Sequence, residues 1–245
     1  MSVFVPREPK LKTPAPQWQE QYQILADNAC DPRLARFYQA GAVHSDTPLD
    51  EVPLLALDVE TTGLDAQNHC IVSLGLMPFD LNRIQCKKAQ YWVVKPQSEL
   101  SSQSITFHHI THSDIRYAPR VEQVLGELLE AMAGCVMVVH YRNIERSFLD
   151  HALQQAVGEG LHFPVIDTME LEARMHGSQR KPSWWDRLRG RQPTSIRLAD
   201  SRLRYNLPHY QAHHALTDAL ATAELLQAQI ATHYSPKTPV GDLWC

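Results

Sequence analysis

The chain has 245 residues, of which 44% are hydrophobic and 20% are charged, and its formal net charge is −4. These values are typical of a globular protein with a buried core, and they exclude a wholly disordered chain and a protein coated in positive charge. No apolar run approaches the roughly 18 residues that span a bilayer, and the first residues lack the apolar stretch of a signal peptide. We therefore expect one main domain, located in the cytoplasm, without membrane association.

The N-terminal part of the chain is expected to precede the core. Residues 1–16 are rich in Pro and Lys and show no periodicity, which indicates a loose arm. Residues 18–25 repeat large apolar side chains with helical spacing, and Asp31 followed by Pro32 is a typical helix start. Residues 1–50 therefore predict an arm and a helical hairpin.

A change of pattern at residue 54 predicts strands. Leu54–Val59, Ile71–Phe79 and Tyr91–Val94 are apolar runs separated by Gly, Asp and Asn turn residues, which predicts an antiparallel meander. Helical spacing over residues 121–132 is followed by a short apolar run at Cys135–Val139, which predicts a helix and then a buried strand.

The second half of the chain alternates helices and strands. Residues 144–156 keep helical spacing, a short strand is expected at Pro164–Ile166, and further helices are expected over Thr168–Met175 and Ala215–Ala231. Alternation after an antiparallel meander predicts an α/β fold in which helices flank a mixed sheet.

A basic segment interrupts this alternation. Residues 176–195 show no clear period and include Trp184 and Trp185, so we expect an inserted loop. The longer stretch 176–206 contains eight of the 23 lysines and arginines but only two acids. Positive charge beside aromatic rings is the usual combination for binding a single nucleic-acid strand. A solvated loop with partly packed tryptophans explains the pattern equally well.

Cysteine and histidine form no familiar disulfide or zinc pattern. The five cysteines are widely spaced and include no Cys-x-x-Cys pair. Several histidines are close in sequence, but they lack matching ligands at the spacing of zinc sites. These histidines are His108, His109, His112, His209 and His214. Surface or substrate-contacting roles are expected for them.

Two acids lie at the end of the first expected strand. Asp58 and Glu60 alternate with Val59, so both carboxylates leave the same face of the sheet. The turn at residues 61–63 ends in glycine and can bring its backbone close to a ligand. Hard divalent cations prefer carboxylate oxygens. The pair therefore indicates a metal site, although a polar strand end before a turn is equally compatible.

Two more acids and a histidine occur in distant parts of the chain. Asp218 lies in the first turn of the last helix. His213 is expected in the preceding loop, since five residues of helix would rotate it about 140° away, and an imidazole there can take a proton from water. Glu145 lies in the first turn of the helix over residues 144–156, where the helix dipole also favours an acid. A surface histidine and a merely stabilising acid are the structural alternatives.

These residues together resemble the motifs of the DEDDh exonucleases, the DnaQ-like family related to the proofreading subunit of DNA polymerase III. Residues 57–64, Leu-Asp-Val-Glu-Thr-Thr-Gly-Leu, resemble the first motif, and His213 with Asp218 resembles the third. The second motif usually ends in aspartate, whereas the stretch His140–Glu145 ends in glutamate. A glutamate carries the same charge one methylene further, so reduced activity or an altered metal preference would be compatible with it.

The resemblance covers roughly residues 53–230 and implies a ribonuclease H-like fold. Such a fold has a mixed five-stranded sheet flanked by helices, here with an N-terminal helical extension. The exonuclease domain would then span residues 51–235 and include the basic loop, and residues 236–245 would form a short C-terminal tail.

The resemblance also implies a catalytic centre. Asp58, Glu60, Glu145 and Asp218 would hold two divalent cations, Mg²⁺ or Mn²⁺, while His213 would activate water. The third acid has an alternative in Asp150, which falls outside the aligned position.

Substrate contacts are implied at the turn that follows the first acids. Thr61 and Thr62 would contact the terminal nucleotide through the backbone, Leu64 would wedge against its base, and His109 would contribute to substrate binding.

The implied reaction is 3′→5′ hydrolysis of a single nucleic-acid strand with release of nucleoside 5′-monophosphates, with DNA favoured over RNA. The alternatives are an enzyme that trims RNA or degrades oligonucleotides, and a nucleic-acid-binding module in which Glu145 has weakened catalysis. Association with a polymerase and the oligomeric state are left open.

Overall fold

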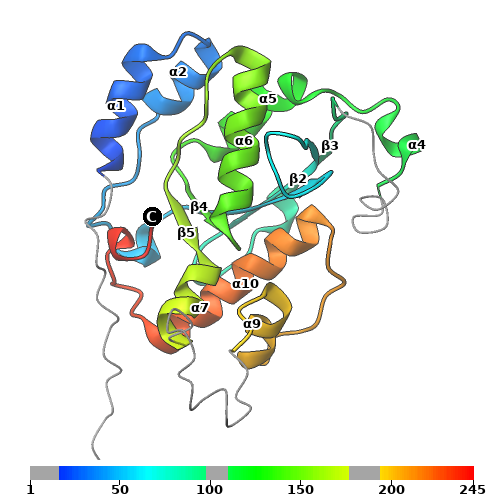
Figure 1. Ribbon diagram of the computed structural model, residues 1–245. Helices are drawn as coiled ribbons and strands as arrows, with labels where there is room; N and C mark the ends of the chain where they lie inside the picture. The colour runs from blue at the N-terminus through cyan, green and yellow to red at the C-terminus, as the bar shows by residue number, and fades with distance from the viewer. Residues whose placement is uncertain (1–16, 98–109, 177–193) are drawn as a thin grey trace, which may run out of the picture.

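A mixed sheet of five strands forms the centre of the protein (Figure 1). The computed structural model describes residues 17–97, 110–176 and 194–245. The strand order is β3-β2-β1-β4-β5, with β2 antiparallel to β1 and β3, and β4 parallel to β1 and β5. The strands are β1 Leu54–Thr61, β2 Ile71–Phe79, β3 Gln90–Val93, β4 Val136–Val139 and β5 Val165–Asp167. The mixed α/β sheet that the sequence predicted is confirmed.

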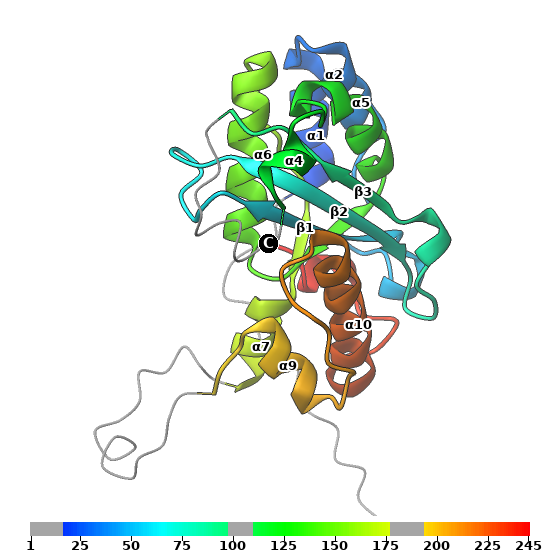
Figure 2. The same cartoon turned by 90° about the vertical axis from the view of Figure 1, so that its right-hand side faces the viewer.

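Helices cover both faces of this sheet, as Figure 2 shows. On one face, α10 (Ala215–His233) packs across β1 and β2, beside α7 (Thr168–His176) and α9 (Leu198–Arg204). On the other face lie α5 (Val121–Met132) and α6 (Arg142–Val157). Because both faces are covered, β4 and the first half of β1 consist of buried apolar residues. The helix α9 was not predicted from the sequence.

The N-terminal extension is helical, as predicted. It consists of α1 (Trp18–Asn28) and α2 (Pro32–Gln39), of which α2 packs against α5. The Asp31 carboxylate caps α2 by accepting a backbone N–H of its first turn at 2.8 Å. Tyr22 contacts Phe37 with ring centroids 5.5 Å apart, so aromatic packing joins the two helices.

The last residues of the chain are part of the core. The sequence predicted only a short tail at residues 236–245, but Val240, Leu243 and Trp244 are each at most 1% exposed. Trp244 also forms a backbone bridge with Ile166 of β5. Their spacing places all three apolar side chains on one side of a tight turn, and this side packs inward.

Several predicted features lie outside the described residues. These are the arm at 1–16, His109, and most of the basic loop with Trp184 and Trp185. None of the described helices is both long enough and apolar enough to cross a membrane. The remaining short elements are α4 His112–Ile115 and the 3-10 turns η1 Leu49–Glu51, η2 Cys86–Lys88 and η3 Val240–Asp242.

Candidate active site

The end of β1 carries two acids on one face. Asp58 lies opposite Gly75 of β2 and Glu60 lies opposite Ser73, whereas the intervening Val59 is buried in the core. A register shift directly after Glu60 interrupts the pairing with β2. Both carboxylates therefore leave the sheet on the same side, at the point where the strand ends.

Gly75 lets the start of α10 lie directly against β2. A Cβ at this position would be 2.4 Å from the carbonyl carbon of Ala215, a distance at which no side chain fits. Because Gly75 pairs with Asp58, the contact places the first turn of α10 beside the acids of β1. Asp218 lies in that turn, and it is thereby brought close to Glu60.

His213 lies in the loop before α10, where the sequence predicted it. Its backbone has φ 70°, and its N–H donates to Asp218 Oδ2 at 2.8 Å. Potential ligand atoms of Glu60, His213 and Asp218 all lie within 4.8 Å of one another. Within the described ranges these three side chains form the one group of its kind that is close enough to share a metal ion.

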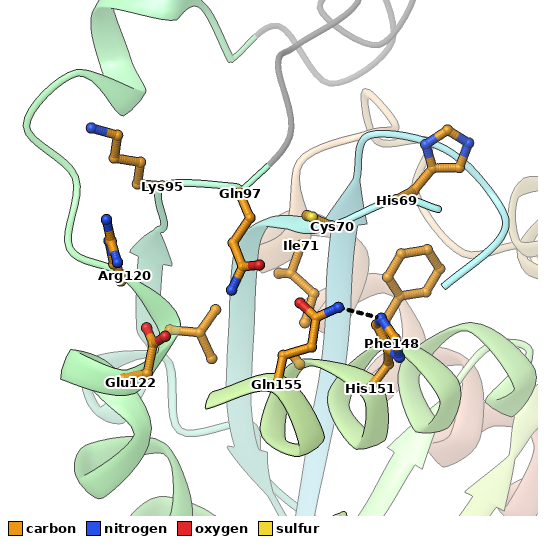
Figure 3. A pocket seen from close by; sticks show the side chains of 12 residues that line it. His69, Cys70, Ile71, Lys95, Gln97, Arg120, Glu122, Phe148, His151 and Gln155 are labelled. Carbon is orange, nitrogen blue, oxygen red and sulfur yellow. Dashed lines mark hydrogen bonds between the residues drawn. The ribbon is translucent and has the colours of Figure 1, made fainter. Parts of the chain in front are cut away.

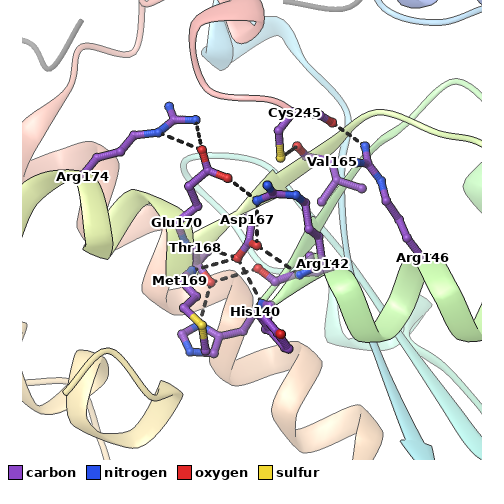
Figure 4. A network of polar contacts seen from close by, with 12 residues as sticks. His140, Arg142, Arg146, Val165, Asp167, Thr168, Met169, Glu170, Arg174 and Cys245 are labelled. Atoms are coloured by element: carbon purple, nitrogen blue, oxygen red, sulfur yellow. Dashed lines mark hydrogen bonds and ion pairs between the residues drawn. The ribbon is translucent and has the colours of Figure 1, made fainter. Parts of the chain in front are cut away.

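The first turn of α6 carries Glu145, and a polar network holds this turn in place (Figure 4). Asp167, at the end of β5, accepts the backbone N–H groups of Tyr141 and Arg142, each at 3.0 Å, and Arg142 also pairs with Glu170. Glu145 is 3% exposed, and its Oε2 atom has no hydrogen-bond partner among the described residues. Burying a carboxylate oxygen without a hydrogen-bond donor costs free energy. A ligand from outside the chain could bind this oxygen and offset that cost.

The four carboxyl groups all have raised pKa values. Burial raises the pKa of Asp58 well above its ordinary value, and neighbouring carboxyls raise it further. In decreasing order these neighbours are Glu145, Glu60 and Asp218. Burial and the charge of Asp218 raise the pKa of Glu60 to about 8. Burial also raises the pKa of Glu145 and that of Asp218. The acids thus form one electrostatic cluster whose repulsion a divalent cation would relieve.

The turn after β1 presents an exposed apolar side chain. The Thr61 hydroxyl donates to the carbonyl of Gly63 at 2.6 Å, and the Thr62 N–H donates to the carbonyl of Cys70 at 2.9 Å. The Thr62 N–H is therefore used in a hydrogen bond between the end of β1 and the start of β2. A backbone contact from Thr62 to a nucleotide would have to use another backbone atom. Leu64 is 85% exposed, directly beyond the turn.

A pocket with basic groups in its lining adjoins this turn (Figure 3). The ring of His69 packs against Gly63, where an added Cβ would lie 2.3 Å from the imidazole. Exposed Lys95 and Arg120 line the opposite side of the pocket, and Glu122 also lines it. No sequence motif marked these residues, because they come from segments that only the fold brings together.

Three further charged residues bind partners within the fold. Asp150 accepts a backbone N–H from the loop after α6 at 3.1 Å, which gives it a structural role. Arg202 is 4% exposed and pairs with Glu224 at 2.7 Å, and Arg204 pairs with Glu172. These two cations of the stretch 176–206 therefore form ion pairs within the fold.

Two bacterial DNA polymerase proteins are similar to this chain in sequence. The DNA polymerase III subunit epsilon of Treponema pallidum is 26% identical over 185 residues, which are 75% of this chain and 79% of that protein. The PolC-type DNA polymerase III of Thermotoga petrophila is 27% identical over 180 residues, which are 74% of this chain but only 12% of that protein. The chain therefore spans most of the epsilon subunit and a small part of the PolC-type protein.

The fold and the family agree with these relatives. The structure of exonuclease X in complex with 5′ overhanging duplex DNA is similar, with a TM-score of 0.56 and 20% identity over 76% of this chain and 97% of that one. The profile of the RNase T family, described as exonuclease, matches residues 55–226, which include every acid of the cluster and His213. The chain therefore belongs to the RNase T exonuclease family and has the ribonuclease H-like fold of the DnaQ-like DEDDh exonucleases, as its motifs predicted.

Proposed function

We propose that this protein is a metal-dependent 3′→5′ exonuclease that removes nucleotides from the end of single-stranded DNA. The observation that carries the proposal is the closeness of Glu60, His213 and Asp218, whose potential ligand atoms lie within 4.8 Å of one another. Asp58 and Glu145 add to this group, because the charges of Glu145, Glu60 and Asp218 all raise the pKa of Asp58. A cluster of partly or fully buried acids with raised pKa values is typical of a functional site.

The donor set fits two divalent cations, Mg²⁺ or Mn²⁺. Asp58, Glu60, Glu145 and Asp218 would hold them, since all four offer carboxylate oxygens and the Oε2 atom of Glu145 has no donor among the described residues. When bound, such a pair supplies positive charge that stabilises both the attacking and the leaving oxygen of a phosphodiester.

His213 is proposed as the general base. Its side chain is exposed, so water can reach it, and its ring lies within 4.8 Å of a carboxylate oxygen of Glu60 and of Asp218. The imidazole takes a proton from water, and the water oxygen attacks the terminal phosphorus. The bond between this phosphorus and the 3′-oxygen of the penultimate nucleotide breaks, the 3′-oxygen takes up a proton from solvent to become a hydroxyl, and a nucleoside 5′-monophosphate leaves.

The turn after β1 is proposed to receive the strand end. Leu64 is exposed and directly follows the turn at Thr61 and Thr62, so it can wedge against the terminal base while the turn receives the terminal nucleotide. The proposed contact from His109 concerns a residue outside the described ranges. Lys95 and Arg120 add positive charge next to the turn, where the phosphates of a bound strand would be attracted. DNA is favoured because the two sequence relatives are DNA polymerase III proteins and the similar structure of exonuclease X contains duplex DNA.

End-labelled single-stranded DNA and RNA of one sequence test this function. We expect the DNA to shorten one nucleotide at a time from its 3′ end in Mg²⁺ or Mn²⁺, with no shortening when a chelator is added. Preferential shortening of RNA would favour the RNA-trimming alternative. Binding of either strand without shortening in both metals would show that the protein is a binding module instead.

A further inference from the structure

The proposed general base has a backbone conformation that needs support. His213 has φ 70°, a left-handed conformation that residues other than glycine adopt at a cost. Its N–H donates to the Asp218 carboxylate at 2.8 Å, which fixes one side of the residue. A loop residue in such a conformation persists only when the surrounding structure fixes its neighbours as well.

An aromatic stack fixes the next residue. His214 is the N-cap of α10 and lies on the ring of Tyr91, with ring centroids 4.7 Å apart and 20° between the ring planes. Tyr91 belongs to β3 and pairs with Gly75 of β2. Gly75 in turn is the residue on which the backbone of Ala215 rests. The edge strand, the glycine and the start of α10 are therefore packed side by side.

Tyr91 borders the acid cluster, whereas its neighbour in the strand does not. Burial raises the pKa of the Tyr91 phenol, the Ser73 side chain beside it lowers that pKa in part, and the nearby carboxyls of Glu60 and Asp114 raise it. Trp92 points to the opposite face of β3, where its indole donates to Glu127 at 3.2 Å. The side chains of Tyr91 and Trp92 thus lie on opposite faces of the sheet.

We propose that Tyr91 is a positioning residue, whose ring holds His214 and thereby keeps His213 beside Glu60 and Asp218. The ring is required for this role and the hydroxyl is not. The effect on catalysis rests on the proposed function, whereas the fixing of the loop does not.

Two substitutions separate the ring from the hydroxyl. With end-labelled DNA in Mg²⁺, Tyr91→Leu is expected to lower kcat about threefold to tenfold, the range that follows from the usual strength of one aromatic pair. KM is expected to stay within about twofold, because the substrate is not touched. Tyr91→Phe keeps the stack and is expected to retain the kcat of the unmodified protein. A rise in KM with unchanged kcat in Tyr91→Leu would overturn the proposal.

Trp92→Leu is the matched control, because it removes a ring from the same strand on the opposite face. We expect its kcat to equal that of the unmodified protein. If Trp92→Leu loses as much activity as Tyr91→Leu, the effect belongs to the strand as a whole and the positioning role is refuted.

Amide hydrogen exchange of His213, followed by NMR, tests the fixing of the loop without any activity. Tyr91→Leu is expected to accelerate this exchange about threefold to tenfold, while Tyr91→Phe and Trp92→Leu leave it unchanged. Unchanged exchange in Tyr91→Leu would refute the role whether or not the protein cleaves DNA. Faster exchange in a protein that cleaves no strand would support the positioning role and refute the proposed function alone.

Discussion

Glu145 and Glu172 are both buried, at 3% and 0% exposed, yet the fold surrounds their carboxyl groups in opposite ways. Glu172 accepts hydrogen bonds from the Gln229 amide and the Tyr205 hydroxyl, each at 2.8 Å, and it pairs with Arg204. These interactions outweigh the effect of burial, and they lower the pKa of Glu172 below its ordinary value. The chain itself thus stabilises this charge between α7, α9 and α10.

The acids at the end of β1 and the start of α6 have no comparable support. Neither Asp58 nor Glu145 pairs with a lysine or arginine in the part of the chain that the structure describes, and their pKa values are raised. The protein therefore contains two kinds of acid. Glu172 is stabilised by partners within the chain, whereas the carboxyls of the cluster repel one another and would be stabilised by a bound cation. Matched amide substitutions can test this distinction.

The largest effect is expected from Asp58→Asn. Removing one carboxylate of a shared metal site is expected to lower kcat by about a thousandfold or more, while the fold stays intact. In the presence of a chelator, the thermal midpoint of this variant should equal or exceed that of the unmodified protein, because a repulsive charge has been removed. Single-turnover cleavage and thermal unfolding measure the two quantities. Undiminished cleavage would remove Asp58 from the proposed catalytic centre.

Glu172→Gln is expected to give the reverse pattern. Loss of one partner leaves Arg204 without its ion pair and should lower the free energy of unfolding by about 3 kcal/mol. The kcat of the folded fraction should stay unchanged, because the partners that hold the Glu172 carboxyl, Gln229, Tyr205 and Arg204, are not members of the cluster. Urea denaturation and active-site-normalised kinetics measure the two effects. A variant that keeps full stability but loses activity would contradict the division between structural and ligand-binding acids.

The two regions also differ in how far the sequence could predict them. Asp58 and Glu60 are separated by one residue at a strand end, and His213 and Asp218 flank a helix start, so local spacing places each pair correctly. The partners of Glu172 are 32 to 57 residues away, and no local pattern connects them.

The approach of α10 to β2 was equally hidden from the sequence. In the sequence, Gly75 is a single glycine within an apolar strand. Only the structure shows that the backbone of Ala215 occupies the space that a side chain at position 75 would need. The stack of Tyr91 on His214 also joins residues that are far apart in sequence. Local periodicity thus predicted the strands and most helices, whereas the contacts that orient the site depend on tertiary packing.

The stability of the protein is expected to depend on pH and on divalent cations. Because the pKa of Glu60 is raised to about 8 from an ordinary 4.5, its contribution to stability is full below about 4.5 and is lost as the pH rises through about 8. The protein in chelator should therefore become less stable between about pH 6.5 and 8, by roughly 2 kcal/mol or about 5 °C. Adding Mg²⁺ at pH 8 should restore the thermal midpoint.

Glu60→Gln is the control for this pH effect. Without the titrating carboxyl, both the fall in thermal midpoint and its rescue by Mg²⁺ should become smaller. Burial lowers the pKa of His140 to about 4. This histidine therefore reduces the stability of the protein only as the pH falls below about 6.5, which lies outside the window from pH 6.5 to 8. A thermal midpoint in chelator that rises from pH 6.5 to 8 would contradict the repulsive cluster.

The smallest effect is expected from Glu145→Asp, which keeps the charge and shortens the side chain by one methylene. The start of α6 is held by the Asp167 carboxylate through two N–H bonds of 3.0 Å, so the backbone cannot easily move to compensate. We expect kcat in Mg²⁺ to fall about threefold to tenfold, the loss typical of a displaced but intact ligand. Glu145→Gln keeps the length of the side chain but removes its charge, and its kcat should fall far more than that of Glu145→Asp. If Glu145→Asp and Glu145→Gln both retain full activity, Glu145 belongs with Glu172 among the structural acids, and the third ligand must come from elsewhere in the chain.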